Sequence, residues 1–274
     1  FDSDGFSLRD GSSGSEPRLN TNKGSTNYVA WNWKAGGTAV SDSSGDITVS
    51  RSTNTDNGIS IISYTGNQDP EGTGETIAHG LSQAPEIAFF KNRDGTNDWI
   101  VGCTPVGWTQ YASLNQRDAF SASNSPFRDT APTSSYITLG GSHSLNKSAN
   151  DYICYAFHSV DSYSKIGSYT GNSSADGIFL YTGFRPAWVM IKCYVGNNNQ
   201  EWVMFDNKRD SYNLATRFFY ADGNDAETIS SPRQLDFVSN GIKMRGDDGA
   251  TNNSSRSYIY LAFAESPFKT ANAR

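Results

Sequence analysis

The residues best suited to acid–base or metal chemistry are few in this sequence and stand far apart. The three histidines, His79, His143 and His158, show none of the spacings that typify metal ligands. The sequence contains no hydrolase serine elbow, no zinc-protease histidine motif and no phosphate-binding loop. We therefore expect each histidine to be structural or to face solvent.

Carboxyl groups on strand-like runs are the next candidates, because glycoside hydrolysis needs two of them facing each other across a cleft. The three candidates are Glu86, Glu201 and Glu265. Nothing in their positions places two of them across a cleft. A hydrolase built on a β-sandwich is therefore disfavoured, and we expect no enzymatic activity.

Oxygen-rich turns and thiols offer little more. Asp-rich turns at residues 94–98, 222–225 and 247–249 could supply the hard oxygens that calcium prefers, but none has the spacing of a calcium-binding loop. Solvated turns are favoured, no cofactor is expected, and calcium stays open as an alternative.

Among Cys103, Cys154 and Cys193 no paired framework is evident, and Cys154 is expected to be a buried thiol; a single disulfide stays open.

Exposed aromatic rings would allow the chain to bind carbohydrate, since the apolar face of a sugar stacks on a flat ring. The sequence has six tryptophans. Trp99 and Trp202 occupy equivalent positions in strand-like runs, which favours a core location. Trp108 lies outside that pattern, and we predict it as the carbohydrate- or receptor-binding residue.

An internal repeat organises the elements that would position these residues. The run Ser-Tyr-Thr-Gly-Asn at residues 63–67 recurs at residues 168–172, about 105 positions later. Similar runs follow both copies in the same order, ending with residues 152–157 (Tyr-Ile-Cys-Tyr-Ala-Phe) and 258–263 (Tyr-Ile-Tyr-Leu-Ala-Phe). The sequence therefore predicts a duplicated unit of about 105 residues.

A partial third copy opens the chain. Residues 1–6 resemble residues 237–242, and residues 28–33 resemble the two closing runs. We predict that residues 1–37 are the second half of a preceding unit, 38–57 a linker, 58–160 the first unit and 161–274 the second. Because the sequence begins with Phe1 inside a unit, we expect it to be a piece of a longer chain. We also expect the strand at residues 28–33 to be paired, since an open strand edge invites association.

The local pattern is that of strands and tight turns. Aromatic residues make up 13% of the chain, charged residues only 18%, and the 26 glycines and many Asn residues suit turns. Only residues 213–220 suggest a short helix. We predict an all-β fold of tandem β-sandwich, jelly-roll-like domains. The formal net charge of −6 argues against a duplex nucleic-acid partner, and the lack of a long apolar run argues against membrane insertion.

Three kinds of segment carry a family resemblance: residues 28–37 (Tyr-Val-Ala-Trp-Asn-Trp-Lys-Ala-Gly-Gly), the two Ser-Tyr-Thr-Gly-Asn runs, and residues 181–192 with 262–268. Together they resemble an uncharacterised repeat-domain family of virion and tail-fibre-like proteins of tailed, mostly marine, bacteriophages. The resemblance implies a location on the virion and partners that are copies of itself, other virion proteins and a host-surface glycan. It carries no catalytic residues.

These observations predict a non-enzymatic structural or adhesion protein of a tailed-bacteriophage virion, such as a tail fibre, a spike or a surface decoration. Paired sandwiches would form a rigid scaffold, and polar loops would carry recognition. A homo-oligomer is expected. The alternative is a secreted carbohydrate-binding, lectin-like module.

Overall fold

The structure, a computed structural model, describes residues 6–8, 25, 27–67, 74–196 and 200–268. The chain divides into two compact units, Phe1–Lys34 and Ala35–Arg274. The described residues of the first unit form no strand, so the predicted strand at residues 28–33 is wrong. Tyr28 and Val29 are exposed, which leaves that run without the buried face a strand requires. The rest of the predicted half-unit, at residues 1–5, 9–24 and 26, lies outside the described residues.

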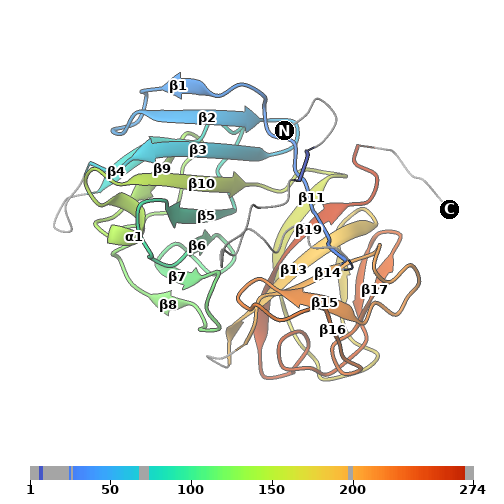
Figure 1. The fold of residues 1–274 in the computed structure, drawn as a ribbon. Coiled ribbons are helices and arrows are strands. Elements are labelled where there is room, and N and C mark those ends of the chain that lie inside the picture. The colour runs from blue at the N-terminus through green and yellow to red at the C-terminus, as the bar shows by residue number, and fades with distance from the viewer. Residues whose placement is uncertain (1–5, 9–24, 26, 68–73, 197–199, 269–274) are drawn as a thin grey trace. The chain divides into compact units, whose positions relative to one another are not determined.

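The second unit is built almost entirely of antiparallel strands (Figure 1). Its first half contains an eight-stranded sheet of order β1-β2-β3-β10-β5-β6-β7-β8 and a two-stranded sheet, β4-β9. The strands of this half are β1 (Val40–Asp42), β2 (Val49–Asn54), β3 (Ile59–Thr65), β4 (Glu75–Ala78), β5 (Ile87–Asn92), β6 (Ile100–Cys103), β7 (Gln110–Ser113), β8 (Ser121–Ala122), β9 (Tyr136–Leu139) and β10 (Asp151–Phe157). One short helix, α1 (His143–Asn146), precedes β10.

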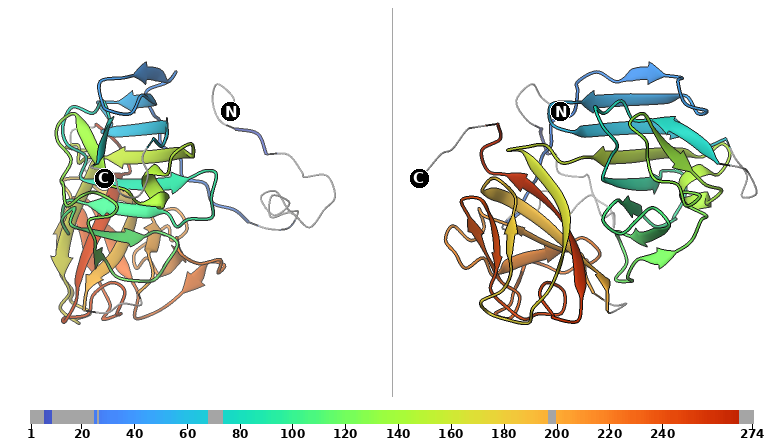
Figure 2. Two further views of the ribbon diagram at one scale, coloured as in Figure 1. Left: turned by 90° about the vertical axis from the view of Figure 1, so that its left-hand side faces the viewer. Right: turned by 180° about the vertical axis from the view of Figure 1, so that it is seen from behind.

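The second half contains a six-stranded sheet of order β11-β19-β13-β14-β15-β16 and a three-stranded sheet of order β12-β18-β17 (Figure 2). Its strands are β11 (Ser164–Thr170), β12 (Phe179–Tyr181), β13 (Pro186–Val195), β14 (Val203–Asp206), β15 (Arg217–Tyr220), β16 (Thr228–Ile229), β17 (Leu235–Val238), β18 (Gly241–Met244) and β19 (Ser257–Ala264). In the part of the chain that the structure describes, no helix is long and apolar enough to span a membrane.

Each half has its own buried core, to which the large sheet and the small sheet both contribute side chains. In the first half, Phe90 of β5 shares a cluster of buried side chains with Ile77 of β4 and Ile137 of β9. In the second half, Phe205 of β14 shares one with Leu180 of β12. Alternate side chains of the strands supply these cores, as the period of a pleated strand requires. The predicted all-β fold class is confirmed, and each half is β-sandwich-like.

Two local predictions are wrong. The segment predicted as a linker, residues 38–57, contains β1 and β2, which extend the large sheet beyond β3. Its Ser- and Thr-rich sequence hid these strands, because a strand near a sheet edge needs few apolar residues; Val49 is its buried anchor. Residues 213–220, predicted as a short helix, end in strand β15. There Phe218 is buried beside β14, and tertiary packing overrides local propensity.

The two large sheets share a strand order. The run β3-β10-β5-β6-β7 in the first half corresponds to β11-β19-β13-β14-β15 in the second, and the pair β4-β9 corresponds to β12-β18. These strands follow one another along the chain at the separation that the repeat predicts. Similar backbone pairings therefore form around both copies of the Ser-Tyr-Thr-Gly-Asn run.

The first copy of this run closes the loop before β10. The Tyr64 hydroxyl donates a hydrogen bond to the Leu145 carbonyl at 2.7 Å, and its ring stacks on Tyr152 with centroids 5.2 Å apart. A Cβ added at Gly66 would lie 2.3 Å from the Lys147 carbonyl oxygen, so only glycine allows this approach.

The second copy forms the same contacts before β19. The Tyr169 hydroxyl donates to the Thr251 carbonyl at 2.6 Å, and its ring stacks on Tyr258 with centroids 4.9 Å apart. A Cβ at Gly171 would lie 2.3 Å from the Asn253 carbonyl oxygen. The repeated motif is therefore explained by folding: tyrosine and glycine together fasten the loop that leads into the last strand.

Candidate functional sites

Trp108, the predicted binding residue, lies in the core. It is only 3% exposed, and its ring meets that of Phe127 edge-on with centroids 4.9 Å apart. Its Nε1 donates to Thr104 Oγ1 at 3.2 Å. A Cβ at Gly102 would come within 2.4 Å of the indole, so the glycine makes room for it. The prediction of a surface role is wrong, because a buried ring cannot stack on a sugar.

The tryptophans predicted to be core residues behave differently from each other. Trp202 is 1% exposed, which confirms its prediction. Trp99 is half-buried and stacks on Tyr155 with centroids 6.2 Å apart. Neither ring forms a free surface platform.

The buried histidines serve structural roles. The amide of Leu81 donates to His79 Nδ1 at 3.1 Å, so His79 Nε2 carries the proton and faces the Thr133 carbonyl at 3.2 Å. Burial lowers the pKa of His79 and favours its neutral form. His158 is also buried, whereas His143 is exposed at the start of α1.

The three candidate glutamates have separate partners. Glu86 accepts a hydrogen bond from the Ser159 amide at 2.5 Å. Glu201 lies 3.6 Å from Arg117 and 3.6 Å from Arg233. Glu265 forms an ion pair with Arg185 at 2.6 Å. Each carboxylate therefore stabilises its own part of the fold.

The Asp-rich turns are likewise held by internal bonds. Asp94 accepts from the Asp151 amide at 2.6 Å, and Asp248 pairs with Arg233 at 2.8 Å. Among the described residues, no group of three His, Cys, Asp or Glu side chains is placed to hold a metal ion. The open calcium alternative gains no support from these contacts.

The cysteines are free and buried, as predicted for Cys154. Burial raises the pKa of Cys103 to about 12. Since the thiolate is the reactive form, this thiol is inert near neutral pH.

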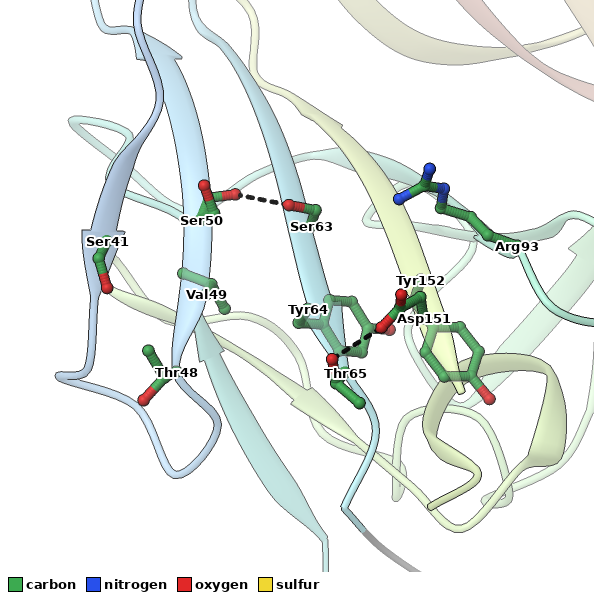
Figure 3. A pocket seen from close by; sticks show the side chains of 10 residues that line it. All are labelled: Ser41, Thr48, Val49, Ser50, Ser63, Tyr64, Thr65, Arg93, Asp151 and Tyr152. Atoms are coloured by element: carbon green, nitrogen blue, oxygen red, sulfur yellow. Dashed lines mark hydrogen bonds between the residues drawn. The ribbon is translucent and has the colours of Figure 1, made fainter. Parts of the chain in front are cut away.

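A polar hollow lies on the eight-stranded sheet (Figure 3). Its volume is about 290 Å³, and it spans β1, β2, β3 and the start of β10. Its lining includes seven hydroxyl-bearing or charged side chains, Ser41, Thr48, Ser50, Ser63, Thr65, Arg93 and Asp151, together with Val49, Tyr64 and Tyr152. Figure 3 shows Ser41 and Ser50 on one side of the hollow and Arg93 and Asp151 on the other. Local sequence gives no sign of this site, because its residues come from distant strands.

A buried lysine joins the two halves of the second unit. Lys192, on β13 of the second half, is fully buried. Its Nζ donates to the Gln200 carbonyl at 2.6 Å and to the Arg117 carbonyl at 2.9 Å, with the Gln116 carbonyl at 3.5 Å. Gln116 and Arg117 belong to the loop after β7, in the first half. One ammonium group thus binds backbone from both halves.

Trp202 strengthens this junction. Its Nε1 donates to the Ser113 carbonyl of β7 at 3.0 Å. Lys192 Nζ lies 5.4 Å from the centre of the Trp202 ring, within range of a cation–π interaction. The Gln200 amide also donates to the Arg117 carbonyl at 3.1 Å. The halves are therefore linked by directional bonds as well as by apolar packing.

The electrostatics of the junction are those of a buried charge. Burial lowers the pKa of Lys192 to about 8, although Asp222 acts in the opposite direction. Burial also raises the pKa of Asp222, whose Oδ1 accepts from the Trp202 amide at 2.9 Å. Asp222 Oδ2 is buried, makes no hydrogen bond with the described residues, and lies 3.8 Å from Arg117 Nε.

An exposed aromatic pair on β12 is the surface that our sequence reasoning missed. Phe179 is 45% exposed and Tyr181 is 65% exposed, while Leu180 between them faces the core. On the neighbouring strand β18, Lys243 is opposite Phe179 and Gly241 is opposite Tyr181. The alternation of aromatic and aliphatic residues in Phe-Leu-Tyr is the sequence signal that could indicate this pair.

Comparison with known protein families identifies the family of this chain. A family model described as a domain of unknown function, DUF7483, matches residues 1–267. No curated protein and no solved structure matches the chain. The family match covers both compact units.

Proposed function

Because the chain belongs to the DUF7483 family, whose function is unknown, we propose a function from its geometry. The protein is a non-enzymatic structural and adhesion component of a tailed-bacteriophage virion: a tail fibre, a spike or a surface decoration. The observation that carries this proposal is the Lys192 junction, where one buried ammonium holds backbone carbonyls of both halves. A particle component that transmits force between particle and host needs such a fixed arrangement of domains.

The same proposal includes the domain architecture. Residues 58–160, whose large sheet β1 and β2 extend, and residues 161–274 are two tandem jelly-roll-like β-sandwiches that arose by duplication. The shared strand order supports this, as do the matched contacts of Tyr64 with Leu145 and of Tyr169 with Thr251. Convergence would not be expected to reproduce both the order and the loop contacts.

Self-association is supported by an open strand edge. In the first half, β2 covers the outer edge of β3, whereas the corresponding edge of β11 pairs with no strand among the described residues. Val160 and the Ser159 hydroxyl cover only its beginning, at Ser164 and Ile166. Ser168 is exposed farther along, where antiparallel pairing with a second copy would continue the sheet.

Light scattering tests this association. The native protein is expected to form oligomers, and Ser168→Pro, which removes one outward amide, is expected to shift the mass toward the monomer. Thr48→Pro is the control, because Thr48 is exposed and lies outside the named strands. Lys165→Pro would not serve, because the backbone of residue 165 faces β19. A native protein that stays monomeric at high concentration would contradict the self-association.

A carbohydrate-binding, lectin-like module is the second candidate, favoured by the aromatic pair of Phe179 and Tyr181. Two rings on one face of a strand provide flat apolar surfaces for sugar rings. This function predicts glycan binding that is lost in Phe179→Ala and Tyr181→Ala. It also predicts a secreted protein that is not attached to a particle.

A further inference from the structure

The polar hollow presents hydrogen-bonding groups that no described residue uses. The hydroxyls of Ser41, Thr48 and Ser50 have no hydrogen-bond partner among the described residues, and neither does the Arg93 guanidinium. Asp151 is partly engaged: its Oδ1 accepts from Thr65 Oγ1 at 2.7 Å. The hollow therefore offers both donors and acceptors to a ligand.

The charge of the hollow selects against anions. Arg93 is its one cationic side chain, and Asp151 offsets it. Asp94 adds a second carboxylate close by, since it accepts from the Asp151 amide at 2.6 Å. An anionic ligand would meet two carboxylates for one guanidinium, whereas a neutral ligand rich in hydroxyls could bond to all of these groups.

The second half shows that the fold does not require a carboxylate at the place of Asp151. There, Thr170 and Ser257 occupy the places of Thr65 and Asp151, and their hydroxyls lie 3.2 Å apart. Since β11 and β19 pair without a carboxylate at this place, Asp151 is not needed for pairing β3 with β10. Beyond its bond with Thr65, Asp151 is therefore available for a further contact.

We propose that the hollow bounded by Ser41, Ser50, Thr65, Arg93 and Asp151 binds a neutral sugar ring through its hydroxyl groups. Arg93 donates to ring hydroxyls, Asp151 accepts from them, and the serine hydroxyls complete the contacts. The volume of about 290 Å³ lies at the small end of ligand pockets, which suits one terminal sugar. This inference rests on the adhesion part of the proposed function and identifies its ligand class.

An NMR titration of the whole chain tests the proposal. The probes are glucose, galactose, mannose and N-acetylglucosamine, with N-acetylneuraminic acid as the anionic comparison. At least one neutral sugar is expected to shift the amide signals of Ser50, Ser63, Thr65 and Asp151, with a dissociation constant on the order of millimolar. Arg93→Gln and Asp151→Asn are each expected to weaken binding roughly tenfold or more, as for a lost charged hydrogen bond.

Controls separate this site from the rest of the molecule. Ser257→Ala, the matched change in the second half, is expected to leave the affinity unchanged. Three results would each overturn the proposal: no shift with any neutral sugar well above millimolar concentration, tighter binding of the anionic sugar, or affinity that survives both Arg93→Gln and Asp151→Asn. Shifts centred on Phe179 and Tyr181 would also overturn it, in favour of the lectin-like module. None of these results bears on whether the protein is part of a particle, which microscopy decides separately.

Discussion

The buried ammonium of Lys192 should make a stabilising contribution that grows as the pH rises into the alkaline range. Its pKa is about 8 in the folded chain and 10.5 as the ordinary value. Between these values the unfolded chain holds a proton that the folded chain has released, so the free energy of unfolding rises with pH. Below about pH 8 both states are protonated, and Lys192 contributes no slope.

The magnitude follows from the same pKa values. One proton bound only by the unfolded chain raises the free energy of unfolding by at most about 1.4 kcal/mol per pH unit. Between pH 8 and 10.5 the largest possible contribution of Lys192 is therefore about 3 kcal/mol.

Buried thiols and tyrosines act in the opposite direction. Burial raises the pKa of Cys103 and Cys154, so the unfolded chain loses those protons first and stability falls from about pH 9. Burial of Tyr64 and Tyr169 has the same effect above about pH 10. The contribution of Lys192 is therefore measured as the difference between the native protein and a Lys192 variant between pH 7 and 9.5.

Urea unfolding of the native protein and of Lys192→Met over this pH range is the assay. The free energy of unfolding of the native protein minus that of Lys192→Met is expected to grow by about 1–2 kcal/mol from pH 7 to 9.5, because the thiols and tyrosines act equally in both proteins. Lys208→Met is the control, since the Lys208 side chain is 76% exposed and should leave the slope intact. If the free energies of unfolding of the native protein and of Lys192→Met change with pH in parallel, Lys192 does not have a lowered pKa, whatever the stability of the variant at pH 7.

Three further predictions concern the cores and the loop contacts, and urea unfolding measures each of them. Trp108→Ala should lower the free energy of unfolding by about 3–5 kcal/mol, because it opens a cavity beside Phe127; a loss below 1 kcal/mol would contradict its burial. Tyr64→Phe and Tyr169→Phe should each cost about 1–2 kcal/mol, because each leaves one loop carbonyl without its donor; very unequal losses would argue against equivalent contacts. Gly66→Ala should cost about 1–3 kcal/mol through its clash with a carbonyl oxygen, and a neutral effect would show that the loop moves freely.

Much of the fold could be predicted from the sequence because its signals are local. Alternating aromatic and aliphatic runs such as residues 152–157 predict strands directly, and β10 forms there. The repeated Ser-Tyr-Thr-Gly-Asn run revealed the duplication, although its role in holding the loop before the last strand needed the partner carbonyls. β2 escaped prediction because its apolar face consists of little more than Val49.

The sites depended on contacts that sequence does not display. The burial of Trp108 is set by Phe127 and Gly102, and nothing in the residues beside it indicates this. Lys192 Nζ donates to the backbone carbonyl of Arg117, which lies 75 residues earlier in the chain. The hollow likewise gathers residues from four strands and a loop, so its hydroxyls and charges read as ordinary surface residues in the sequence.

Electron microscopy can show whether this chain is a structural and adhesion component of a virion. A gold-labelled antibody raised against the purified chain would be applied to particles of a phage that encodes this chain. For a virion component, regular label is expected on a tail fibre, a spike or the particle surface. Label confined to soluble material, with none on intact particles, would contradict it.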